Sequence, residues 1–305
     1  MTYAFCMLDD RDVYVSGDTA VTRRDAIKPD LHPGICKVVP IRFDVVAAFA
    51  GEVGEAIKLL RDLRERPEPL STEKIVSELV LSDAVASGAV EFLVASCAGD
   101  VRRVFKVSAS GSATGSDFYW IGDVDAAKQH ALRSSEHVAS MSDEVDRRFS
   151  GTVALSAFNS VLSGGLVGVG GSALTMRSRP GFPFYFETVV DTLMDEQAVG
   201  PALEVMKIAV PHSNQFVRSV LRPSYPDIAV VAVYVAFADM GWIYRPFADP
   251  PVQSIVGVTF HAFRQELHRQ TGVLFDGLPV GRIQLGSDEV HPFPFELVFV
   301  PSESA

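Results

Sequence analysis

Thr2 is the residue of this sequence with the clearest chemical potential, because removal of Met1 would make it the amino terminus. A threonine hydroxyl is a poor nucleophile until a base accepts its proton. The α-amine of the same residue can be that base, since its reference pKa is about 7.7–8.0. Thr2 with a free amine could therefore attack an amide carbonyl and carry the acyl group as an ester.

Two other motifs have weaker chemical content. The segment Gly168–Ala173 matches the letters of a dinucleotide-binding loop, but such a loop follows a strand and opens a helix, whereas these surroundings predict a strand. His261 and His268 lie seven residues apart on a predicted helix, and the zinc-protease motif needs a spacing of four. We therefore expect no nucleotide, metal ion or other cofactor.

Composition predicts a folded chain and excludes some partners. The 305 residues are 48% hydrophobic and 21% charged, which is enough apolar surface to offset chain entropy. The formal net charge is -11, from 38 acidic and 27 basic side chains, so the chain has no general basic field for nucleic acid or an anionic membrane. We expect neither as a partner.

Sequence features also predict a cytoplasmic protein. Cys6, Cys36 and Cys97 lie in apolar segments, which favours buried, reduced thiols over disulfides. The uncharged stretch 151–176 contains six glycines, so we do not expect it to span a membrane. The first ten residues have neither the basic start nor the apolar stretch of a secretory signal.

Strand and helix patterns come in blocks along residues 1–190. The expected strands are Thr2–Leu8, Val13–Ser16, Ile35–Arg42, Val45–Ala50, Glu91–Cys97, Val101–Val107, Phe118–Ile121, Leu166–Met176 and Phe182–Val189. Two helices from Glu52 and about Thr72 precede the fifth strand, and helical pattern from Asp123 to about Leu162, with a break near Ser142, precedes the eighth. This order predicts an α+β fold in which two antiparallel sheets pack together with helices outside.

Residues 191–305 predict a C-terminal α+β extension. Its expected strands are Leu203–Val210, Phe216–Leu221, Asp227–Phe237, Val280–Leu285 and Phe295–Val300. Apolar residues from Val252 to Leu267 recur at helical spacing, so we expect a helix that Pro251 opens and Gly272 closes. Whether this extension covers an active site or contacts a neighbouring subunit stays open.

Five short segments carry a family resemblance. In chain order they are Thr2-Tyr3, Val15-Ser16-Gly17-Asp18, Lys37-Val38, Val45–Gly51 with the helix after it, and Ser163-Gly164-Gly165. Together with the order of elements they resemble the proteasome β-subunit family, including the bacterial peptidase partner of an unfoldase ring and the bacterial ancestral β-subunit proteins. The resemblance covers about residues 2–190. It implies the four-layer αββα sandwich of the N-terminal nucleophile hydrolases, and rings or spirals of identical subunits.

The resemblance also implies roles for individual residues. Lys37 matches the lysine whose charge favours the threonine alkoxide, and Asp18 matches the aspartate that holds this lysine. Gly51 matches the glycine whose backbone N–H donates to the developing oxyanion. Ser163 matches a serine near the terminal amine.

Two positions depart from the family pattern. Asp123 stands where the family has a serine in a Gly-Ser-Gly turn, and Ser160 stands where it has an aspartate. The exchange could keep one carboxylate and one hydroxyl near the amine. Asp123 also has a simpler interpretation as the N-cap of the helix that follows it.

These residues predict a threonine-type peptidase or amidohydrolase that cleaves amide bonds, peptide bonds in the first place, through Thr2. The expected protein is a cytoplasmic homo-oligomer with a peptide or protein substrate. Because Asp123 and Ser160 depart from the family pattern, a catalytically inactive subunit that serves assembly or partner binding stays an alternative. An amidase or acylase of small molecules is a further alternative, because related folds carry such enzymes.

Overall fold

The computed structural model describes residues 2–9, 12–21, 34–98, 101–140, 150–162, 166, 169–188, 190–193, 216–235 and 239–277. In these residues the chain is a mixed α+β protein with three antiparallel sheets and six helices. The α+β class and the antiparallel pairing predicted from the sequence are thereby confirmed. Within the described part of the chain, no helix has the length and apolar character needed to cross a membrane.

The first sheet has five strands in the order β10-β9-β2-β1-β8. They are β1 (Tyr3–Leu8), β2 (Val13–Gly17), β8 (Phe118–Gly122), β9 (Leu174–Ser178) and β10 (Tyr185–Phe186). Alternation along β1 gives the sheet two apolar faces, because successive side chains of a strand point to opposite sides. Tyr3 and Phe5 lie in a cluster with helical residues, whereas Ala4 and Cys6 lie in the central core.

The second sheet has five strands in the order β3-β4-β5-β6-β7. They are β3 (Val38–Arg42), β4 (Val45–Gly51), β5 (Val90–Ala98), β6 (Val101–Ser108) and β7 (Gly111–Thr114). Ala48 and Ala50 of β4 share the central core with Ala4, while Ala47 and Phe49 face the opposite way into a cluster with helices. The first two sheets therefore pack face to face.

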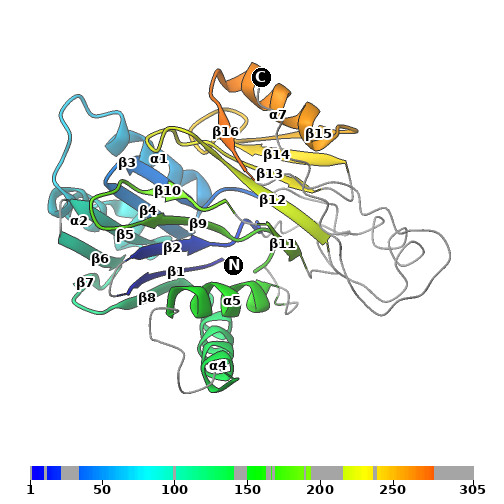
Figure 1. The fold of residues 1–305 in the computed structure, drawn as a ribbon. Coiled ribbons are helices and arrows are strands. Elements are labelled where there is room, and N and C mark those ends of the chain that lie inside the picture. The colour runs from blue at the N-terminus through cyan, green and yellow to red at the C-terminus, as the bar shows by residue number, and fades with distance from the viewer. Residues whose placement is uncertain are drawn as a thin grey trace.

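Helices cover the outer faces of both sheets (Figure 1). The second sheet carries α1 (Val53–Arg64), α2 (Thr72–Val80) and α3 (Asp83–Ala86), and the first sheet carries α4 (Val124–Ser140) and α5 (Ser150–Leu162). The helix expected from Glu52 is confirmed, and its buried residues, Ala56, Ile57, Leu60 and Leu63, lie on one face. Ser71 caps α2, with its side chain accepting the Lys74 N–H at 3.2 Å.

The third sheet comes from the C-terminal part of the chain. Its strands are β11 (Val190–Leu193), β12 (Phe216–Pro223), β13 (Val231–Val235), β14 (Met240–Tyr244) and β15 (Val252–Val256), with β16 (Phe275–Asp276) paired to β12. Helix α7 (Phe260–Thr271) packs Phe263 on the side of Ile243. The other side, with Trp242 and Tyr244, joins the central core. The sheet begins at Val190, and it shares a core with the first two sheets (Figure 1).

The prediction that Pro251 opens a helix is wrong. The residues after it form β15, which pairs with β14, and α7 begins only at Phe260 with Thr259 as its N-cap. Three of the five residues of β15 are Val or Ile, which favour extended backbone, and Gly257 separates the strand from the helix with a φ of 73°. The predicted end at Gly272 is confirmed by its left-handed φ of 68°.

Other element predictions need smaller corrections. Strand β9 begins at Leu174 rather than at 166, and β13 begins at Val231 rather than at 227. The sequence patterns do not predict the short elements α3, β7 and β14. The predicted strands at 203–210, 280–285 and 295–300, and the break near Ser142, lie outside the described residues.

The cysteine prediction is confirmed. Cys6, Cys36 and Cys97 are free and buried. Burial raises the pKa of the Cys36 thiol to about 12, because the charged thiolate is disfavoured without solvent. These thiols are therefore protonated and unreactive at neutral pH.

We expect Leu60→Ala to lower the free energy of unfolding by about 2–5 kcal/mol, because it opens a cavity beneath α1. Leu60 is fully buried in this helix. Lys58→Ala on the exposed face of the same helix is the matched control and should stay within about 0.5 kcal/mol of the wild type. Chemical denaturation of the three proteins measures the difference. Equal stabilities of the two variants would contradict the packing described here.

Candidate active site

Thr2 lies at the start of β1 and is 7% exposed. Its carbonyl oxygen accepts the backbone N–H of Asp123 at 2.7 Å. The next residue, Tyr3, is paired with Gly122 at the end of β8. Thr2 is therefore held by backbone contacts from two segments that are far apart in the sequence.

Asp18 and Lys37 form a buried ion pair. Lys37 Nζ lies 2.8 Å from Asp18 Oδ1, and the two side chains are 1% and 0% exposed. Asp18 follows β2, and Lys37 precedes β3, so the pair joins the first sheet to the second. Lys37 Nζ also donates to the carbonyl oxygen of Ala20.

Backbone donors complete the surroundings of Asp18. Its Oδ1 accepts the N–H of Tyr3 at 3.3 Å, and its Oδ2 accepts the N–H of Gly170 at 3.2 Å. Burial raises the pKa of the Asp18 carboxyl, while Lys37 and these N–H groups oppose the rise because they stabilise the ionised form. Burial lowers the pKa of the Lys37 ammonium, and the charge of Asp18 opposes that shift.

The ion pair lies beside the backbone of Thr2. Lys37 Nζ and the Tyr3 nitrogen both donate to the same oxygen, Asp18 Oδ1, and that nitrogen is bonded to the carbonyl carbon of Thr2. A second bond runs from the Asp18 N–H to the Tyr3 carbonyl at 3.2 Å. Three of the residues expected from the sequence, Thr2, Asp18 and Lys37, are thus together.

The end of β4 approaches the same place. A Cβ atom on Gly122 would lie 2.0 Å from the Thr2 oxygen and 3.2 Å from the Ala50 Cβ, so these three residues are in close contact. Gly51 follows Ala50 with a φ of 109°, and a Cβ there would lie 2.0 Å from the Ala89 oxygen. Only glycine fits at both glycine positions, because a side chain would collide with backbone.

Asp123 is next to Thr2, but its carboxylate caps α4. Its Oδ1 accepts the Ala126 N–H at 2.8 Å, which is the geometry of an N-cap. The hydroxyl of Ser160, inside α5, donates to the Ser156 carbonyl at 3.0 Å. Ser163 lies outside the described residues, so its place relative to Thr2 stays a prediction.

The glycine-rich segment at 169–172 forms hydrogen bonds with the loop of Asp18. The sequence did not predict this contact. Gly170 donates to Asp18 and accepts the Ala20 N–H at 3.1 Å. The Ser172 N–H donates to the Thr19 hydroxyl oxygen at 2.9 Å. Backbone N–H donors such as these leave no signal of their own in a sequence, because any residue except proline carries one.

The third sheet also reaches this loop. The buried Tyr244 of β14 lies beside Thr19, whose side chain opposes the rise in the pKa of the phenol, and near Cys36, the neighbour of Lys37. Burial is the main reason that the pKa of the Tyr244 phenol is raised. The C-terminal part of the chain therefore contributes to the surroundings of the ion pair.

Tyr3 links the site to the helical layer through His130. The Tyr3 hydroxyl lies 2.7 Å from His130 Nδ1, and His130 Nε2 lies 2.8 Å from the Ala154 carbonyl. A carbonyl can only accept, so Nε2 carries the proton and Nδ1 accepts from Tyr3. His130 is 1% exposed, and burial lowers the pKa of its imidazole.

Comparison with known proteins adds no assignment: the sequence matches no protein-family model and no curated protein sequence. Function therefore has to be argued from the residues and their geometry.

We expect Lys37→Met to lower the free energy of unfolding by about 3–5 kcal/mol, because it leaves a buried carboxylate without its cation. Adding Asp18→Asn should recover part of the loss, since the unpaired charge is then removed. Lys58→Met, on the exposed face of α1, is the control. Denaturant titration measures all four proteins. A Lys37→Met protein as stable as the control variant would refute a buried ion pair.

His130 should make stability depend on pH. As the pH falls through about 6.5, the unfolded imidazole binds a proton that the folded one refuses, so stability present above this pH is lost below it. His130→Gln keeps a donor for Ala154 and an acceptor for Tyr3, and should lose less stability between pH 7.5 and 5.5 than the wild type does. His261→Gln, at an exposed position of α7, should behave as the wild type. Identical pH dependence in all three proteins would count against this role.

Proposed function

We propose that this chain is an N-terminal threonine hydrolase that cleaves amide bonds, peptide bonds in the first place. The observation that carries the proposal is the buried Lys37–Asp18 pair, fixed at 2.8 Å and hydrogen-bonded to the residue next to Thr2. A buried pair is costly because both charges lose water, and a structural role alone could be met by apolar residues. We propose that the charge of Lys37 stabilises the alkoxide that Thr2 must form to attack a substrate.

The arrangement of sheets and helices in layers also supports the proposal. Two helices cover the first sheet, the first sheet packs on the second, and α1 and α2 cover the far side of the second. This stacking agrees with the four-layer αββα sandwich of N-terminal nucleophile hydrolases. A cytoplasmic homo-oligomer, ring or spiral, is part of the proposal by family resemblance.

The proposed reaction begins after Met1 has been removed. The Thr2 α-amine takes the proton of Oγ1, and Oγ1 attacks the substrate carbonyl carbon to give a tetrahedral oxyanion. The Lys37 charge favours the alkoxide, and the Gly51 N–H is the proposed donor to the oxyanion. The C–N bond then breaks, and the leaving amine takes the proton from the α-ammonium. Water hydrolyses the resulting ester, which releases the acid and restores Thr2.

A second candidate is a catalytically inactive subunit of the same fold that acts in assembly or partner binding. Two observations favour it. Thr2 is only 7% exposed, and the Asp123 carboxylate already serves as the cap of α4. In that case the Lys37–Asp18 pair would serve only to join the two sheets.

Thr2→Ala should reduce hydrolysis of fluorogenic peptides by at least about 1,000-fold, because the nucleophile is lost. Thr2→Ser keeps a hydroxyl and should retain measurable turnover. Both variants should unfold at the wild-type denaturant concentration, which excludes a loss of fold as the cause. Activity that survives Thr2→Ala would reject Thr2 as the nucleophile, and no activity in the wild type would favour the inactive subunit.

The mass of the intact native protein tests whether Met1 has been removed. The proposal requires a chain that begins at Thr2, because a Thr2 nitrogen bonded to Met1 would be an amide and could not act as the base. Retention of Met1 in the purified protein, together with peptide hydrolysis, would overturn the proposed mechanism while leaving the fold untouched.

A further inference from the structure

A cavity of about 510 Å³ lies between the first and third sheets, apart from Thr2. Its walls come from the region of β9 and β10 on one side and from the ends of β12 and β16 on the other. Arg177 of this wall pairs with Tyr14 near the start of β2, whereas Asp18 follows the opposite end of that strand. The volume is in the range of sites for small ligands, about 300–1,000 Å³.

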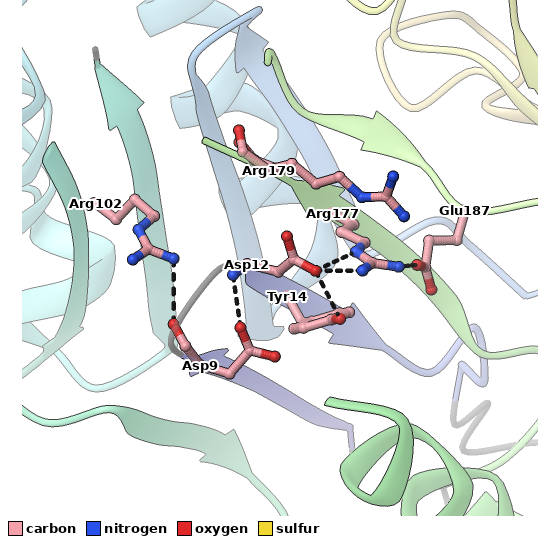
Figure 2. Close-up of polar contacts among 8 residues, drawn as sticks. Asp9, Asp12, Tyr14, Arg102, Arg177, Arg179 and Glu187 are labelled. Carbon is pink, nitrogen blue, oxygen red and sulfur yellow. Dashed lines mark hydrogen bonds and ion pairs between the residues drawn. The ribbon is translucent and has the colours of Figure 1, made fainter. Parts of the chain in front are cut away.

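Two of the three arginines in the cavity wall already have acidic partners. Arg177 Nε donates to Asp12 at 2.9 Å and Arg177 Nη1 donates to Glu187 at 3.0 Å, as Figure 2 shows. Arg222 lies 3.8 Å from Asp276 and 4.8 Å from the ring centre of Tyr185. These contacts hold both guanidinium groups in place.

Arg179 is the third arginine, and its guanidinium makes no hydrogen bond or ion pair with another described residue (Figure 2). It is exposed at the turn after β9. Arg177 and Arg222 are matched by the carboxylates of Asp12, Glu187 and Asp276. Arg179 is therefore the one arginine of this wall without an acidic partner among the described residues.

Apolar and aromatic side chains line the same cavity as Arg179. Phe182 lines the cavity and is 62% exposed, and Pro183, Pro223 and Pro226 line it as well. Tyr225, between two lining residues, is 63% exposed. Large apolar surfaces left open to water around a few polar groups are typical of ligand sites.

We infer that this cavity binds a small organic anion, a carboxylate on an aromatic or apolar body. Arg179 would pair with the carboxylate through two parallel N–H donors, a geometry that a guanidinium favours. Phe182 and the prolines would contact the body of the ligand. One unpaired guanidinium fits a singly charged carboxylate better than a phosphate dianion. This site goes beyond the proposed hydrolase, because none of its residues belongs to the Thr2 constellation.

Binding of 2-naphthoate to the full chain, with uncharged 2-naphthamide as the neutral analogue, tests the inference by ligand fluorescence or calorimetry. We expect naphthoate to bind at least about tenfold more tightly than naphthamide, and Arg179→Gln to remove most of that difference. Phe182→Ala should weaken both ligands. Arg133→Gln, on the exposed surface of α4, is the matched control and should leave both affinities unchanged.

Three outcomes would overturn the inference: equal affinities for the two ligands, an Arg179→Gln protein that binds naphthoate as the wild type does, or inorganic phosphate that binds more tightly than naphthoate. Thr2→Ala separates the two proposals. We expect it to leave naphthoate binding unchanged, so a failure of the hydrolase proposal would not remove this site, and the reverse also holds.

Discussion

The ion pair of Lys37 and Asp18 is the constraint on which the centre of the structure depends. Two charges without water are tolerated only where other groups replace the solvent, and here the Tyr3 and Gly170 N–H groups and the Ala20 carbonyl do so. Each of these groups belongs to a different segment of the chain. Satisfying the pair therefore fixes the start of β1, the loop after β2 and the segment before β9 relative to one another.

Much of the fold could be predicted from the sequence, because local periodicity and burial agree there. Ala56, Ile57, Leu60 and Leu63 recur at helical spacing and are the buried residues of α1, and the first two expected strands form an antiparallel pair. The prediction fails where the apolar residues of a segment fit both the helical and the strand periodicity. Val252–Val256 has apolar residues at helical spacing, yet pairing with β14 makes it a strand.

The candidate site could be predicted only in part. The family resemblance implied a site of Thr2, Asp18 and Lys37, and in the structure Asp18 pairs with Lys37 and accepts the N–H of Tyr3, the residue after Thr2. The groups that complete their surroundings could not be found in this way, since Gly170 contributes a backbone N–H and Tyr244 comes from a distant strand. Asp123 illustrates the opposite case: the local rule for a helix N-cap describes its side chain better than the family pattern does.

The contact between Tyr244 and Thr19 has a consequence for biosynthesis. These residues are 225 positions apart, and at about 5–20 residues per second the ribosome needs roughly 11–45 s to travel between them. During that time the nascent chain contains Thr2, Asp18 and Lys37 but not the tyrosine that packs against their loop. The surroundings of the ion pair close only late in translation, which makes the timing of chain completion part of how this centre is assembled.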